Sequence, residues 1–165
     1  MILASTANAM RMVPLSIDQL TSKAQLVLHG KVTGKTVQRD AEGRIYTRIE
    51  MEVTDTWKGT ATNRFVMVQG GGVLGEEVAS VSGQAEFLIN EEVVVFLVLN
   101  QRREGVVIGL VQGKFKVTKE ASGEKMVHNV FHGVPSGEKS HLNEKSNAAR
   151  LSLEQLKQRV QGGGR

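Results

Sequence analysis

The chain has 165 residues, with no cysteine, two prolines and seven aromatic side chains. Without cysteine, the protein has no disulfide bond, no thiolate metal ligand and no thiol nucleophile. Its few aromatic residues provide little material for the exposed rings on which many single-stranded nucleic acids stack their bases. No stretch reaches the roughly 18 apolar residues of a membrane-spanning helix. The sequence therefore predicts one domain with an ordinary core, no bound cofactor and no membrane span.

Positive charge is in excess, with a formal net charge of +4 and an isoelectric point of about 9.5. Such an excess is typical of proteins that bind nucleic acid or another polyanion. Its distribution weakens that interpretation, because residues 1–90 carry equal numbers of basic and acidic side chains and most of the excess lies in residues 137–165. We therefore expect the partner to be another protein or a second copy of this chain, with nucleic acid as the less favoured alternative.

The N-terminal residues 1–9 allow two interpretations. They end in Ala7-Asn8-Ala9, which fits the small-residue pattern before a signal-peptidase cleavage site. However, the stretch has no basic residue at its start, and its apolar part is too short for a complete signal peptide. It is either the remnant of a signal peptide or an ordinary small-residue N-terminus. The first interpretation, which we favour, predicts a secreted or periplasmic protein, and the second a cytoplasmic one.

One long segment, Arg44–Gly59, has the clearest pattern in the chain. Its alternate positions are mostly apolar and are flanked by charged residues: Ile45, Thr47, Ile49, Met51 and Val53. Since side chains alternate between faces along a strand, one face of this segment should lie in a core and the other in water. At about 3.3 Å per residue, residues 44–57 of this segment would span roughly 40 Å. That length predicts a strand that bends around a barrel.

Further strands are predicted on both sides of this segment. Residues 25–37 form the first, and its glycines at Gly30 and Gly34 indicate a bulge or a tight bend. Residues 91–99 are so apolar that we expect a strand buried on both faces, covered on its outer side by the terminal helices. The remaining predicted strands are residues 64–69, a weak edge ribbon within 73–84, 106–108, 112–117 and 126–130.

Two short helices are predicted from capping boxes, in which a serine is followed by glutamine three residues later. Ser16 and Gln19 begin a helix that should end near Lys23. Ser152 and Gln155 repeat the pattern near the C-terminus. Apolar side chains at helical spacing there predict an amphipathic helix over residues 149–161.

Together these patterns predict a mainly β fold. It is a closed or partly open antiparallel barrel of five to seven strands, similar to the oligonucleotide/oligosaccharide-binding (OB) barrel, with a short helix near each terminus. Residues 10–131 would form this barrel domain. Residues 132–148 are polar and contain glycine, proline and serine early on, which predicts a linker to the C-terminal helix.

Three histidines are the candidate metal ligands. His128 and His132 are four residues apart and His141 follows, and histidine is a common zinc ligand. The segment is predicted to run from a strand into a loop, where this spacing does not place both rings on one side. Asn129 also replaces the glutamate of the metalloprotease helix motif. We therefore expect solvated histidines, no metal and, since no catalytic motif is recognisable, no enzyme.

Five cations are the candidate binding residues, because they would lie along one predicted hairpin: Arg102, Arg103, Lys114, Lys116 and Lys119. A basic patch of this kind on an OB barrel would suit single-stranded nucleic acid or another anionic polymer. The alternative interpretation, which we favour, is a charged strand face in contact with solvent. Most of the aromatic residues lie in apolar runs that are typical of a core.

Five segments together resemble a known group of proteins: Leu20–Gly30, Gly43–Thr47, Trp57–Gly59, Asn90–Leu97 and Gln112–Phe115. In order and spacing they resemble exported bacterial proteins of unknown function, which are similar to netrin-like and tissue-inhibitor-of-metalloproteinase OB modules. The resemblance covers residues 16–118 and implies an OB-like barrel in an exported setting. In the inhibitors an N-terminal cysteine chelates zinc, and this chain has no cysteine. No functional residue of the family therefore carries over.

From these observations we expect a non-catalytic binding or assembly module of an exported protein, with a ligand that the sequence does not specify. The first alternative is an OB barrel that binds single-stranded nucleic acid or an anionic polymer. The second is a protein that interacts with a protease.

Overall fold

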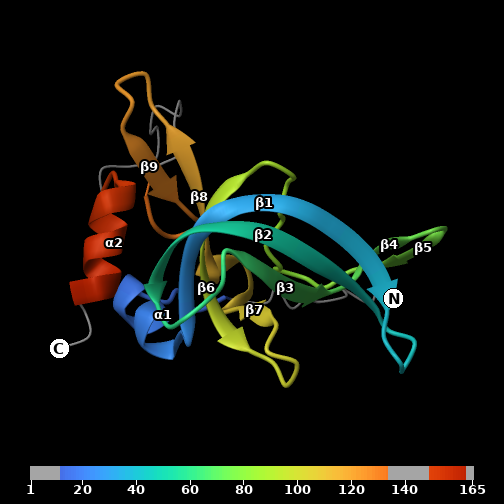
Figure 1. Ribbon diagram of the computed structural model, residues 1–165. Coiled ribbons are helices and arrows are strands. Elements are labelled where there is room, and N and C mark those ends of the chain that lie inside the picture. Colours follow the sequence, from blue (N-terminus) through green and yellow to red (C-terminus); the bar gives the residue numbers. More distant parts are fainter. Residues whose placement is uncertain (1–11, 134–148, 163–165) are drawn as a thin grey trace, which may run out of the picture.

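The computed structural model describes residues 12–133 and 149–162. Its centre is a closed barrel of five strands (Figure 1): β1 (Leu26–Arg39), β2 (Ile45–Lys58), β3 (Arg64–Gly70), β6 (Glu92–Leu99) and β7 (Gly105–Val107). The barrel closes because β1 pairs with β2 along one edge and with β6 along the other. The predicted mainly β barrel is thus confirmed.

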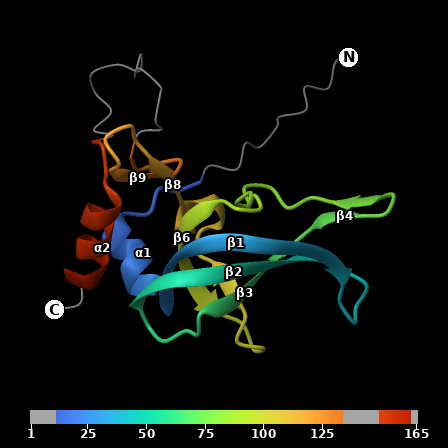
Figure 2. The same cartoon turned by 45° about the horizontal axis from the view of Figure 1, so that its top comes forward.

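The other elements extend this barrel at both ends: α1 (Ile17–Lys23), β4 (Gly72–Leu74), β5 (Glu77–Ala79), the 3₁₀ helix η1 (Leu110–Gly113), β8 (Lys114–Lys119), β9 (Lys125–His128) and α2 (Leu153–Gly162). The β4–β5 ribbon projects beyond the far end of β1, whereas the two helices lie side by side at the opposite end (Figures 1 and 2). The predicted edge ribbon and both predicted helices are confirmed. Within the described ranges, no helix combines the length and apolar character needed to span a membrane.

One strand pair in the otherwise antiparallel barrel is parallel. The strands follow the order β1-β2-β3-β7-β6, and β6 returns to β1. A ring of five strands cannot alternate in direction throughout, so one neighbouring pair must run parallel. That pair is β3 and β7, whose ladder consists of the single pair Met67↔Gly105.

Strand β6 is buried on both faces, as its sequence predicts. Val93, Val95 and Leu97 belong to the core inside the barrel, together with Met51 of β2. The alternate side chains of β6 lie in a second core outside the barrel, which contains residues of both helices: Val94 and Phe96 with Leu20 of α1 and Leu156 of α2. The helices therefore cover the outer face of β6, which confirms the expectation from its apolar run.

The predicted capping boxes begin both helices. In α1, the Ser16 Oγ accepts from the Gln19 N–H (3.1 Å) and the Gln19 Oε1 accepts from the Ser16 N–H (2.9 Å). Ser152 and Gln155 make the same pair of hydrogen bonds at α2, at 3.0 and 2.9 Å. The predicted start of this helix at residue 149 is wrong. The chain before the cap is extended, and Ser152 forms a bridge to Met126.

Parts of the predicted domain organisation fall outside the described residues, namely 1–9 with the signal-peptide interpretation and most of the 132–148 segment. The start of that segment is described, and it lies against the barrel domain. The Nε2 of His132 is 2.8 Å from the carbonyl oxygen of Leu15, and its ring stacks on Phe115. The contact with the domain therefore continues to at least His132.

The bulges predicted for the first strand are present, and they depend on one close approach of two backbones. The β1–β2 register shifts between His29 and Gly30 and again between Val32 and Gly34. A Cβ at Gly30 would collide with the backbone carbonyl oxygen of Glu52. At Gly34, a Cβ would lie 3.2 Å from the flexible Glu50 carboxylate.

We expect Gly30→Ala to destabilise the protein by at least about 2 kcal/mol, because overpacking against backbone forces the strands apart. Gly34→Ala is the matched control on the same strand and should change the free energy of unfolding by less than about 1 kcal/mol. Urea denaturation of both variants measures the difference. Equal effects of the two substitutions would contradict the bulge geometry.

Candidate functional site

Lys114, one of the predicted binding cations, is a buried structural residue. Its side chain is 11% exposed, and its Nζ lies 2.8 Å from both carboxylate oxygens of Glu91. It also donates to the carbonyl oxygen of Glu86 and lies 4.9 Å from the centre of the Phe87 ring. Burial lowers the pKa of Lys114, against the opposing effect of Glu91. Lys114 thus ties the segment before β6 to β8 and does not face solvent as a free cation.

The other four predicted cations do not form one patch. Arg102 and Arg103 lie in the turn between β6 and β7, next to the Leu99 end of β6. Lys116 lies opposite Val93, at the other end of β6, and Lys119 follows it along β8. Six residues of strand separate the two ends, which is roughly 20 Å. The expectation of a single hairpin is wrong because η1 interrupts the chain, so that β7 and β8 pair with different parts of β6.

The candidate metal ligands are not assembled into a site. His128 lies on β9 and His132 follows in the loop, where its Nε2 is engaged with Leu15. His141 lies outside the described residues. In residues 12–133 and 149–162, no group of three or more histidine, aspartate or glutamate side chains is placed so that it could hold a metal ion.

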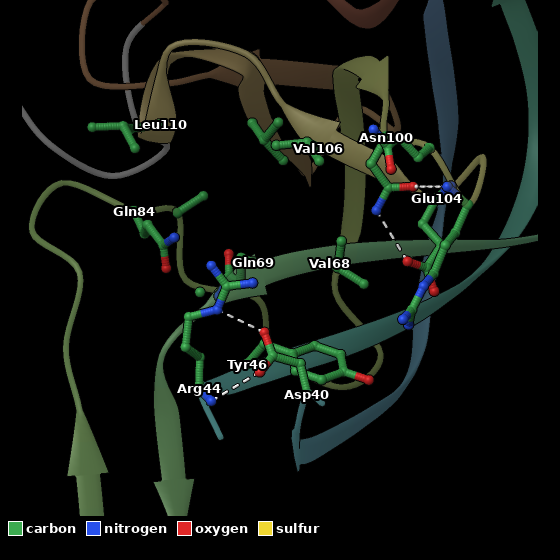
Figure 3. A pocket seen from close by; sticks show the side chains of 15 residues that line it. Asp40, Arg44, Tyr46, Val68, Gln69, Gln84, Asn100, Glu104, Val106 and Leu110 are labelled. Carbon is green, nitrogen blue, oxygen red and sulfur yellow. Dashed lines mark hydrogen bonds and ion pairs between the residues drawn. The ribbon is translucent and has the colours of Figure 1, made fainter. Parts of the chain in front are cut away.

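The structure instead contains a cleft of about 510 Å³ at the end of the barrel where β3 and β7 diverge (Figure 3). One wall is the β1–β2 turn with Asp40 and Arg44, and the opposite wall is the β6–β7 turn with Asn100 and Glu104. The end of β3, at residues 68–70, lies between them. Of the five predicted cations, Arg102 lines this cleft. Its volume lies within the range of about 300–1,000 Å³ that is usual for ligand sites.

The two turns that flank the cleft are built by the same rule, and both are held firmly. The Asp40 Oδ1 accepts from the N–H groups two and four residues later, at 3.0 and 2.9 Å. The Asn100 Oδ1 accepts from the N–H groups at the same spacing, both at 2.9 Å. These two side-chain oxygens accept hydrogen bonds from turn N–H groups that would otherwise bond to water, and they thereby stabilise the turns. The backbone N–H of Arg44, followed by its side chain, lowers the pKa of Asp40 below the ordinary value of 3.8.

The floor of the cleft is apolar and contains one strained residue. Its apolar lining includes Val68, Val106 and Leu110, and Tyr46 is the aromatic residue of the lining. Leu110 adopts a left-handed backbone conformation with φ 60°, which costs about 1–2 kcal/mol for a residue with a side chain. Strain of this kind is commonly found at functional sites.

The rim of the cleft is polar but electrically balanced. Its charged groups are the carboxylates of Asp40 and Glu104 and the guanidinium groups of Arg44 and Arg102. The remaining polar side chains are amides, which both donate and accept hydrogen bonds: Gln69, Gln84, Asn100 and Gln101. Such a lining suits an uncharged ligand that has apolar groups and hydrogen-bonding groups in alternation. It offers no net attraction to a polyanion.

A second, charged cleft of about 430 Å³ lies where α2 and the β8–β9 hairpin meet the barrel. At its base the buried His29 has its Nε2 2.7 Å from the Glu92 Oε1, which also accepts from the Lys125 Nζ at 2.8 Å. Across the cleft, the Asp55 Oδ2 accepts from the Lys157 Nζ at 2.7 Å. The first set of contacts joins β1, β6 and β9, and the second joins β2 to α2, so the arrangement is explained by its structural role.

A scan against models of protein families gives no match, and a search of curated proteins gives none either. The resemblance to netrin-like and inhibitor modules therefore stays a prediction.

Sequence reasoning missed the cleft between the two turns. The polar loop before the long strand and the turn after residue 99 are visible as breaks in the apolar pattern. A shared signal was present, because Asp40 and Asn100 each begin a turn and are typical turn-forming residues. That the two turns face each other follows only from the strand order.

The ion pair between Asp55 and Lys157 should make the docking of α2 pH dependent. The hydrogen bond from Lys157 lowers the pKa of Asp55 below 3.8, and its stabilising effect is therefore present above that value and lost as the pH falls through the folded-state pKa. We expect Lys157→Met to lower the free energy of unfolding at pH 7 and to have a smaller effect at pH 3. Urea denaturation at both pH values measures the difference.

Arg159→Met is the matched control, because Arg159 is exposed on the same helix. It should have little effect at either pH. An effect of Lys157→Met that is the same at pH 3 and pH 7 would contradict the role of this ion pair.

Proposed function

We propose that the protein is a non-catalytic binding module whose cleft takes an uncharged, extended segment of a partner protein. The observation that carries this proposal is the cleft between two rigid turns, with an apolar floor, an amide-rich rim and balanced charge. In an extended peptide, side chains alternate with hydrogen-bonding backbone groups. Apolar side chains of such a peptide would contact the floor of the cleft, and its backbone groups would bond to the amides of the rim. Polar groups that fix orientation over an apolar surface are the usual composition of a ligand site.

The strand order supports an OB barrel as the framework. β7 and β8 pair with successive parts of β6, so together they take the place of one broken fifth strand. In this numbering β6 is the fourth strand. The order around the barrel is therefore first, second, third, fifth and fourth, and the fourth strand pairs with the first. OB barrels bind ligands beside the second and third strands, between the loops that follow the first and the fourth. The β1–β2 and β6–β7 turns occupy these two positions and flank the cleft.

A nucleic-acid ligand has less support. The charges on the outward-facing side of β2 and β3 cancel, since Arg48 lies 3.8 Å from Glu50, and Glu52 lies opposite Arg64 in the ladder. Tyr46 is the aromatic residue in the cleft lining. Single-stranded nucleic acids are usually held by a basic groove with several stacking rings. No contact of the described residues favours a protease over another protein partner. We also propose that the protein is exported.

A non-catalytic role is supported by the state of the carboxylates at the cleft. Asp40 is committed to its turn by hydrogen bonds to two backbone N–H groups and the Arg44 side chain. Glu104 accepts from the Asn100 Nδ2 at 3.0 Å. Groups held in this way stabilise the walls of a binding site and are poorly placed to exchange protons with a substrate.

The proposal is tested with an eight-residue peptide of alternating threonine and valine with blocked ends. We expect it to shift the amide resonances of Tyr46, Val68 and Leu110. Val68→Thr should weaken its binding at least threefold, because the substitution reduces apolar contact on the floor of the cleft. Val66→Thr is the matched control two residues earlier on the same face of β3, outside the cleft, and should leave the affinity unchanged.

An oligothymidylate of similar length is the competing probe. Oligothymidylate that shifts the same resonances, with an affinity that falls steeply as salt is raised, would contradict the proposal in favour of nucleic acid. Equal weakening by both valine substitutions would place the peptide elsewhere on the barrel.

A further inference from the structure

The edge of β3 that faces the cleft has almost no strand partner. On its opposite edge β3 pairs with β2 along its whole length, from Glu52↔Arg64 to Tyr46↔Gly70. Toward β7 its ladder contains one pair, Met67↔Gly105. Residues 68–70 continue past that pair into the cleft. A strand edge in this situation is a template for pairing with another chain.

A side chain takes the place of a strand at the end of this edge. The Gln84 carboxamide meets both backbone groups of Gly70, in the orientation in which its nitrogen donates to the carbonyl (2.6 Å) and its oxygen accepts from the N–H (3.2 Å). A carboxamide has the same donor and acceptor as a peptide group. Gln84 therefore satisfies the edge of β3 in the way that a neighbouring strand would.

Gly70 has no side chain, and the space beside it is narrow on the side of Val81. A Cβ there would lie 3.3 Å from the Val81 Cγ2 and 3.8 Å from the Gln84 Nε2. The segment that carries Gln84, residues 80–84, is not a strand. The hydrogen bonds at Gly70 are thus made by a flexible side chain from an irregular segment, and a true strand could replace them without breaking any ladder of the barrel.

We propose that the partner segment binds by adding to β3 as a further strand, with one of its peptide groups replacing the Gln84 carboxamide at Gly70. This inference rests on the proposed function and adds the manner of recognition. Main-chain hydrogen bonds supply affinity in such strand addition, and pockets for alternate side chains supply specificity. Here one apolar side chain of the segment faces the floor made by Val68, Val106 and Leu110.

In this arrangement Gln84 competes with the partner for the same two backbone groups. Removing the competitor leaves Gly70 without a partner in the free protein, and binding then no longer has to break an existing pair of hydrogen bonds. We expect Gln84→Ala to bind the blocked threonine–valine peptide about fivefold more tightly than the unchanged protein, from the usual net strength of such hydrogen bonds. Titration calorimetry or fluorescence anisotropy measures the affinities.

Gln161→Ala is the matched control, because Gln161 is an exposed glutamine of α2 that does not line the cleft. It should leave the affinity unchanged. A second probe is the same peptide with single amides replaced in turn by esters. The replacement removes one N–H without changing the side chains, and at least one position should lose tenfold or more in affinity.

Hydrogen exchange at Gly70 provides a readout that does not depend on affinity. In Gln84→Ala the Gly70 amide should exchange faster than in the unchanged protein and should become protected again when the peptide is added. If the peptide binds at the cleft but Gln84→Ala weakens its binding or leaves it unchanged, strand addition is overturned. The proposed function would still stand in that case. Absence of peptide binding at millimolar concentration overturns both.

Discussion

The structure depends on the pairing of β1 with two neighbours at once. Over Val27–Lys31, β1 is hydrogen-bonded to β6 while its other edge is paired with β2. This double pairing closes the barrel and leaves a ring of five strands, in which one pair must be parallel. The parallel pair is β3 and β7, with the single ladder position Met67↔Gly105. The cleft lies where these two strands separate, so the candidate site is a direct consequence of how the barrel closes.

The rest of the molecule supports this closure from both sides. The sheet around β6 separates one core inside the barrel from a second core beneath the helices. Buried pairs such as Lys114–Glu91 fix the segments that lead into β6. At the open end, Asp40 and Asn100 hold their turns by hydrogen bonds to backbone N–H groups. These hydrogen bonds hold the walls of the cleft, whereas the contact with Gly70 is made by the Gln84 side chain, which is the group that we propose a ligand replaces.

Much of the fold could be predicted from the sequence, because alternation and capping are local patterns. The residues from Ile45 to Val53 alternate as a half-buried strand, and the run around Val95 has the composition of a strand buried on both faces. The site could not be predicted, since it depends on which turns face each other. The role of Lys114 was also hidden, because the partners of a lysine are set by long-range packing. For the same reason the predicted basic hairpin was wrong: η1 separates two strands that are close in sequence.

Native-state hydrogen exchange of the β1 and β6 amides tests the closure most directly. If the pairing of Leu26–Lys31 with Glu92–Leu97 holds the barrel together, the amides that bond across these strands should exchange only through global unfolding. Their free energies of exchange should then equal those of the amides between β1 and β2. Exchange across β1 and β6 that is orders of magnitude faster than across β1 and β2 would show an open sheet, and the account of the cleft would fail with it.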